Sequence, residues 1–292
     1  MIDNAVGPSA LVTTSTPAGA WRAFGRHRLA ATALVVFAVV VLAALLSTVL
    51  PLPDPNAQVL LDRLQAPSPH HLLGTDELGR DQLARLLSAT RISLWAALQA
   101  TVVGVVLGVP VGLLTGTVGG RLDAVLSRAF DAIQSIPALI LAIAVVAVLG
   151  RQLTPAMISI GIAFSPTFYR VSRAAASTVA GETYVEASRA MGQKTIRIVA
   201  DHVLGNVAAA LVVVISTTFA FGILAEAALS YLGLGVQPPS ASLGSMLTSA
   251  ANLLNSAPQL TVEPGLVIVL LVLCVSLVSD AVQSLTSAEG GR

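Results

Sequence analysis

Long apolar runs alternate with shorter polar stretches along most of the chain. An α-helix rises about 1.5 Å per residue, so roughly 20 apolar residues are needed to cross the hydrocarbon core of a membrane. The pattern predicts an all-α polytopic membrane protein with six transmembrane helices. The expected spans are 29–50, 92–116, 130–149, 154–172, 207–233 and 264–285.

The first apolar run follows several arginines, as the apolar core of a secretory signal sequence also does. Such cores extend over about 7–15 residues, whereas this run continues from Leu29 to Leu50. We therefore expect a retained first transmembrane helix at 29–50, preceded by a cytoplasmic tail at 1–28.

Composition agrees with a membrane protein, because 55% of the residues are hydrophobic and only 11% are charged. Soluble domains carry roughly 25% charged residues. The net charge is +1 and Lys194 is the only lysine, so no basic block indicates a nucleic-acid partner. Cys274 is the only cysteine, which excludes a disulfide within the chain.

Basic residues near the spans predict the orientation, because Lys and Arg gather on the cytoplasmic side. Most of them fall inside if the N-terminus is cytoplasmic, so we expect both termini inside and an extracytoplasmic segment at 51–90. Within that segment, Asp76 and Glu77 followed by spaced leucines predict a short amphipathic helix from Thr75 onward.

Small residues recur every four positions along the second span. Such a stripe lets helix backbones approach closely in lipid, and it fits either packing within this subunit or contact with a second membrane subunit. Pro110 and Pro137 predict kinks in the second and third spans. The stripe comprises Ala96, Ala100, Gly104, Gly108, Gly112 and Gly116.

A polar insert at 176–206 separates two apolar runs. We expect a helix at 178–191, with Glu182 and Glu186 on one face, and a second helix from Lys194 to Val203. Gly192 suits the positive φ of a helix C-terminal cap. The insert is either a helix–turn–helix that offers an acidic point to a basic partner or a solvated loop that only fixes topology.

The insert resembles the EAA loop of ATP-binding-cassette importer permeases, whose pattern is E-A-A-x3-G-x9-I-x-L-P. Here Glu186 and Ala187 are followed by Gly192 at the same spacing. The sequence departs from the pattern at Ser188, His202 and Gly205. The Gly205 departure is expected to loosen the turn into the fifth span.

Two other stretches are similar to the peptide/nickel branch of this family, specifically its "C" type permeases. They are His71–Asp81 with Arg91–Leu94, and Leu224–Pro239. The resemblance covers about residues 20–285 and implies a type I importer permease fold, with the permease core at 91–287.

The resemblance also implies partners and a role. A homologous second permease would form a heterodimer with this chain, one or two ATPase subunits or a fused ATPase would dock on the insert, and an extracytoplasmic binding protein would deliver peptides. The chain would lie in the lipid of the bacterial plasma membrane and work by alternating access. The implied coupling residues are Glu182, Glu186, Ala187, Arg189, Ala190 and Gly192.

Three alternatives stay open: the same architecture with nickel chelate, haem or a sugar-peptide as cargo, an ion-coupled secondary carrier, or a membrane scaffold. The sequence has no G-x-x-x-x-G-K-[ST] loop, so ATP and Mg²⁺ are expected at partner subunits rather than on this non-catalytic chain. His70 and His71 are adjacent and lack a third ligand nearby, so we expect no metal site and no bound cofactor.

Polar side chains within the spans are the remaining candidates, because ionisable groups in a membrane often serve function. Asp131 lies near one end of the third span. Glu226 fits either a pathway or gate or a buried structural pair. Three neighbouring hydroxyls either line a polar pathway or bond back to the helix; they are Ser216, Thr217 and Thr218.

Overall fold

The computed structural model describes residues 28–289, and every regular element in that range is helical. The expected cytoplasmic tail, apart from Arg28, lies outside the described residues. The α-helices are α2 (Arg28–Leu46), α3 (Gln82–Val118), α4 (Gly120–Gln134), α5 (Ala138–Leu149), α6 (Leu153–Ala180), α7 (Thr183–Ala190), α8 (Thr195–Ile198), α9 (Leu204–Tyr231), α10 (Leu243–Ala250) and α11 (Gln259–Glu289).

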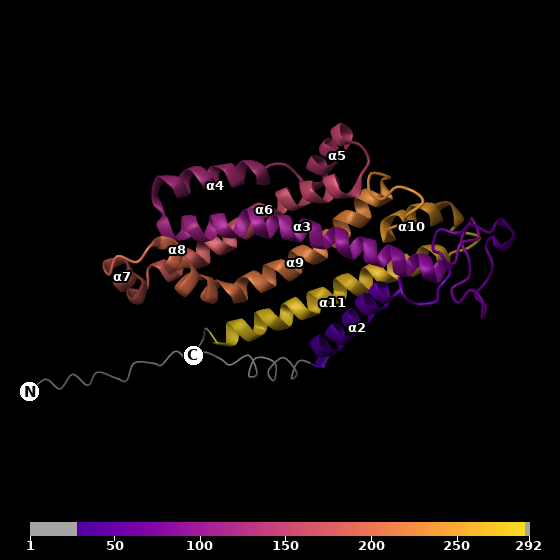
Figure 1. Ribbon diagram of the computed structural model, residues 1–292, viewed down its shortest axis with the longest axis horizontal. Coiled ribbons are helices and arrows are strands. Elements are labelled where there is room, and N and C mark those ends of the chain that lie inside the picture. The colour runs from indigo at the N-terminus through magenta and orange to yellow at the C-terminus, as the bar shows by residue number, and fades with distance from the viewer. Residues whose placement is uncertain (1–27, 290–292) are drawn as a thin grey trace, which may run out of the picture.

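The long helices follow the long axis of an elongated bundle (Figure 1). One end, which we call the insert end, carries α7 and α8, and the other, the loop end, carries α10 and the segment between α2 and α3. Helices α3, α6 and α9 pack on one another, while α11 packs on α9 and α2. The chain therefore passes repeatedly between the two ends, as a polytopic membrane protein must.

Four helical segments of residues 28–289 are long and apolar enough to cross a membrane: Arg28–Leu46, Gln82–Val118, Val207–Tyr231 and Gln259–Ser284. They match the expected first, second, fifth and sixth spans. The expected fourth span lies within α6, whose 28 residues are long enough but more polar. The all-helical prediction is confirmed.

The expected third span, 130–149, is not one straight helix. Helices α4 and α5 meet at an angle of 77° across a short break. Pro137 lies at that break, where it lacks an N–H to donate to a continuing helix. Because α5 has only 12 residues, about 18 Å of helix, it cannot cross a bilayer alone. The kink expected at Pro137 is thus a full break, whereas Pro110 lies inside an uninterrupted α3.

The expected short helix from Thr75 is wrong. Residues 75–81 form a turn, and α3 begins only at Gln82. Asp81 caps it by accepting a hydrogen bond from the Ala84 N–H at 2.8 Å. The helix then continues for 37 residues, so the boundary expected at residue 91 lies within a single helix.

The small-residue stripe of α3 faces α6 of the same chain. A Cβ atom added at Gly108 would lie 2.6 Å from the Cβ of Phe168 and 2.8 Å from the Tyr169 nitrogen. In the other direction, a Cβ at Gly161 of α6 would lie 2.6 Å from the Ala100 carbonyl oxygen. The two backbones are therefore in direct contact, and this face is already occupied within the subunit. Gly104, Gly112 and Gly116 meet α6 in the same way.

We expect Gly108→Leu to destabilise the folded chain by at least the 1–3 kcal/mol typical of an overpacked core. The atoms that a side chain would meet include backbone, which cannot rotate away. Gly205→Leu is the matched control, because nothing lies within 4 Å of a Cβ there. Folded yield and melting temperature in detergent measure both. Wild-type values for Gly108→Leu would contradict the close contact.

Candidate functional site

The polar insert forms two helices, although not with the expected boundaries. The chain breaks at Gly181 and Glu182, so the single helix expected at 178–191 is wrong. Glu182 has extended backbone angles and stands as the N-cap of α7. Glu182 and Glu186 are consequently not successive-turn neighbours on one regular helix.

Helix α7 is attached to the bundle by its inward side. Val185 is fully buried, in a cluster with Ile198 and Val203. Ser188, three residues further on, is also buried and donates a hydrogen bond to the Tyr184 carbonyl at 2.9 Å. The opposite side of the helix, with Glu186, Ala187 and Ala190, is exposed.

A second attachment joins α7 to α3. The Arg189 guanidinium donates a hydrogen bond to the Thr117 carbonyl at 2.7 Å. Thr117 lies in the last turn of α3, where carbonyls lack helical partners and a cation is favourable. Arg189, one of the coupling residues that the resemblance implies, thus fastens the insert to a spanning helix.

Gly192 ends α7 as the sequence predicted. Its φ is +81°, and the Gly192 N–H donates to the Arg189 carbonyl at 2.9 Å while the Gln193 N–H donates to the Ser188 carbonyl at 3.1 Å. These two bonds form a Schellman motif. The chain then enters α8, passes through a π-helical segment, Val199–Val203, and continues directly into α9. The loosened turn expected at Gly205 is wrong, because Gly205 lies within this continuous helix.

Large apolar side chains are exposed beside the turn, and sequence reasoning missed them. Met191 is 80% exposed and Ile196 is 75% exposed. They flank Gly192 in an otherwise polar stretch, which is the signal that could have revealed them. Exposed apolar groups rimmed by polar ones are typical of a protein–protein contact. We call Glu186, Ala187, Ala190, Met191 and Ile196 the insert surface.

Glu226 is fully buried near the loop end. Its carboxylate accepts hydrogen bonds of 2.6 Å from the Ser93 and Ser230 hydroxyls. The Ser93 hydroxyl in turn accepts the Leu243 N–H of α10 at 3.2 Å. Glu226 therefore joins α3, α9 and α10, and in this conformation it faces hydroxyl groups rather than an open channel.

The three hydroxyls of α9 are arranged differently from one another. Ser216 and Thr217 donate to carbonyls one turn back, both at 2.9 Å. The Thr217 hydroxyl also lies 3.3 Å from the Ser279 hydroxyl of α11, and Thr218 is buried. The Ser216 and Thr217 hydroxyls are thus hydrogen-bonded within the α9–α11 pair. Asp131, by contrast, is half-exposed and pairs with Arg170 of α6 at 2.6 Å.

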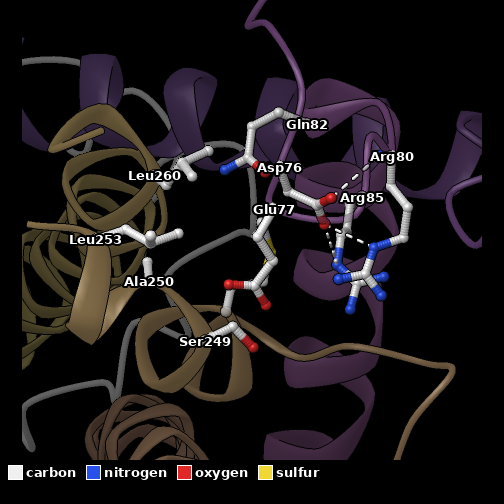
Figure 2. A pocket seen from close by; sticks show the side chains of 10 residues that line it. Asp76, Glu77, Arg80, Gln82, Arg85, Ser249, Ala250, Leu253 and Leu260 are labelled. Carbon is white, nitrogen blue, oxygen red and sulfur yellow. Dashed lines mark hydrogen bonds and ion pairs between the residues drawn. The ribbon is translucent and has the colours of Figure 1, made fainter. Parts of the chain in front are cut away.

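The stretch before α3 folds into a compact polar loop. Asp76 accepts hydrogen bonds from the Arg80 N–H at 3.0 Å and from its side chain at 2.6 Å. Figure 2 shows this carboxylate between Arg80 and Arg85 at one wall of a pocket, opposite residues of α10 and α11. Within residues 28–289, no group of three or more His, Cys, Asp or Glu side chains could hold a metal ion.

Two family profiles match the chain. Residues 108–288 match the binding-protein-dependent transport system inner membrane component, and residues 18–67 match the N-terminal transmembrane domain of oligopeptide transport permease C. The first match includes the whole insert, and the second includes α2.

Curated relatives are similar over most of their length. The di/tripeptide transport system permease protein DppC of Pseudomonas aeruginosa is 37% identical, over 90% of this chain and 89% of its own. A peptide transport system permease protein of Brucella abortus is 36% identical, over 95% of this chain and 92% of its own.

Among solved structures, a chain of the MetNI methionine ABC transporter in an inward-facing conformation superposes with a TM-score of 0.55. It is 23% identical, and the match covers 68% of this chain and 95% of that one. The chain accordingly has the helical fold of type I ATP-binding-cassette permeases.

We expect Glu226→Ala to lower stability by about 1–3 kcal/mol, because the buried Ser93 and Ser230 hydroxyls lose the carboxylate to which both donate. Glu226→Gln keeps an acceptor oxygen and should lose less. Melting temperature in detergent measures both variants, with Glu186→Ala as an exposed-acid control. Equal melting temperatures for Glu226→Ala and the wild type would contradict the structural role.

Proposed function

The chain belongs to the family of inner membrane components of binding-protein-dependent transport systems, and from this premise we propose that it carries di- or oligopeptides inward as a permease subunit of an ATP-driven importer. The observation that carries the proposal is similarity to peptide permeases along nearly the whole chain, insert included. Membership of the family makes an ATPase and a binding protein its general partners.

The proposed complex is a heterodimer of this chain with a homologous permease. Each permease receives one ATPase subunit, or one half of a fused ATPase, and an extracytoplasmic binding protein delivers the peptide. The docking site for the ATPase is the insert surface, supported by the exposure of Met191 and Ile196 beside Glu186. An exposed ion pair contributes only about 0–1 kcal/mol, so apolar contact supplies much of the affinity.

The contacts of the insert with the long helices allow a movement of α7 to be passed on to them. Arg189 joins α7 to the end of α3, and the buried Val185 joins it to α8 and the start of α9. A displacement imposed on α7 by ATPase closure therefore moves long helices as bodies, which is the rigid-body gating that alternating access requires. Glu182 caps the N-terminal end of α7, and Gly192 ends the helix at its C-terminal end.

In the proposed orientation, both termini and the insert face the cytoplasm of a bacterium, and the loop end, with residues 51–90, faces outward. The chain acts as a non-catalytic subunit. ATP and Mg²⁺ are bound by the ATPases, and this subunit needs no cofactor. A gate that includes Glu226, Ser216, Thr217 and Thr218 remains part of the proposal for other conformations of the cycle.

Peptide cargo is preferred over nickel chelate or haem because the similar curated permeases are named for dipeptides, tripeptides and glutathione. An ion-coupled carrier is not favoured, because the buried Glu226 is held by hydroxyls near the loop end. Uptake of a labelled dipeptide by cells with and without this gene tests the cargo.

We expect Glu186→Lys to reduce peptide uptake at least tenfold, because the lysine repels a basic partner that the carboxylate would attract. The subunit should still reach the membrane, since Glu186 is exposed and outside the buried cluster. Asp280→Lys, at an exposed acid on α11, is the charge-matched control and should transport normally. Uptake, membrane level and co-purified ATPase are measured together. Normal ATP-driven uptake by Glu186→Lys would refute the coupling role.

A further inference from the structure

An apolar groove of about 710 Å³ runs between α2 and α3. Its size lies within the roughly 300–1,000 Å³ range of ligand sites. Phe37 of α2 and Phe219 of α9 close its inner end, with ring centroids 6.4 Å apart in an edge-to-face arrangement. Val41, Ala44, Leu45, Ile92, Leu94, Trp95, Leu98 and Leu153 complete the apolar walls.

At its other end the groove reaches Arg91, which also lines a second, more polar cavity of about 320 Å³. The chain that follows α2 and the first turns of α3 form this second cavity. Ser47, Thr48 and Ser88 are among the residues that line it. One arginine therefore stands where a long apolar groove meets a polar pocket.

The charge of Arg91 is not balanced within the described chain. Among residues 28–289, no hydrogen bond or ion pair engages its side chain. Trp95, one turn along α3, is 59% exposed at the edge of the groove. An exposed tryptophan beside an arginine is typical of the level where lipid headgroups lie.

The dimensions of the groove suit an acyl chain. From Arg91 to Leu98 the groove follows α3 for seven residues, which is about 10 Å along the helix axis. One leaflet of the hydrocarbon core is about 15 Å deep. The apolar walls thus run from the headgroup level toward the bilayer centre, in the direction that a lipid tail takes.

We propose that this pair of cavities binds a single glycerophospholipid. One of its two acyl chains lies in the groove, its phosphate pairs with the Arg91 guanidinium, and its headgroup occupies the polar pocket. Asp54 also lines that pocket without forming an ion pair with Arg91 in the described structure. A headgroup with an ammonium group balances the negative charge of Asp54, so the site favours phosphatidylethanolamine over phosphatidylglycerol.

Native mass spectrometry of the assembled transporter, purified in mild detergent and titrated with each lipid, tests the proposal. We expect a phosphatidylethanolamine adduct that survives delipidation in the wild type and falls at least fivefold in Arg91→Gln. Arg91→Lys should retain most of it. Arg63→Gln is the control, because Arg63 is exposed and lines neither cavity. Inorganic phosphate at millimolar concentration should not displace the adduct.

Equal adducts in Arg91→Gln and the wild type, displacement by free phosphate, or a preference for phosphatidylglycerol would overturn this assignment. A photoreactive benzophenone residue at position 95 distinguishes the occupants directly. A lipid-sized mass addition supports the proposal, whereas cross-linking to another polypeptide would show that a neighbouring subunit fills the groove. These experiments measure lipid binding and not transport. A negative result would therefore overturn the lipid site without contradicting the proposed function in peptide transport.

Discussion

Direct backbone contact between α3 and α6 forms the centre of the helix bundle. Lipid tails are as apolar as leucine, so spanning helices gain little by hiding apolar surface from water and must gain by close packing. The glycines at 104, 108, 112 and 116 make that packing possible. A similar contact joins α9 to α3, where a Cβ on Gly222 would lie 3.2 Å from the Ala97 Cβ. Helix α3 is thereby the common partner of both neighbours, and its position fixes theirs.

The same helix carries a polar attachment near each end. At the loop end, the Ser93 hydroxyl joins the Glu226 carboxylate and the N-terminus of α10. At the insert end, the Thr117 carbonyl accepts a hydrogen bond from the Arg189 guanidinium. Buried polar contacts in lipid specify geometry because the alternative is an unsatisfied group. A displacement of α7 at the insert end can therefore reach the opposite end through one continuous helix, without passing through a loop.

Hydropathy located α2, α3, α9 and α11 well, because a run of about 20 apolar residues has few other structural solutions. The Gly192 cap was equally readable, since its positive φ restricts the residue type. The break before α5, the turn at 75–81 and the split at Gly181 were not readable, because each depends on a local choice between helix and turn that tertiary contacts decide. The sequence also could not predict that the glycine stripe would pack on α6 or that Arg189 would reach Thr117. Residue spacing shows which side chains share a helix face, but it does not show which element packs on that face.

The π-helical segment Val199–Val203 has a consequence for how α9 is oriented. A π turn accommodates one residue more than an α turn, and one residue corresponds to about 100° of rotation around the axis. With α8 held by the buried Ile198, that extra residue sets the azimuth of everything downstream. The Glu226 side chain points at its serine partners because the π segment, more than twenty positions earlier, sets the rotation of α9 about its axis. Deleting one residue from the π segment would rotate α9 and turn Glu226 away from these serines.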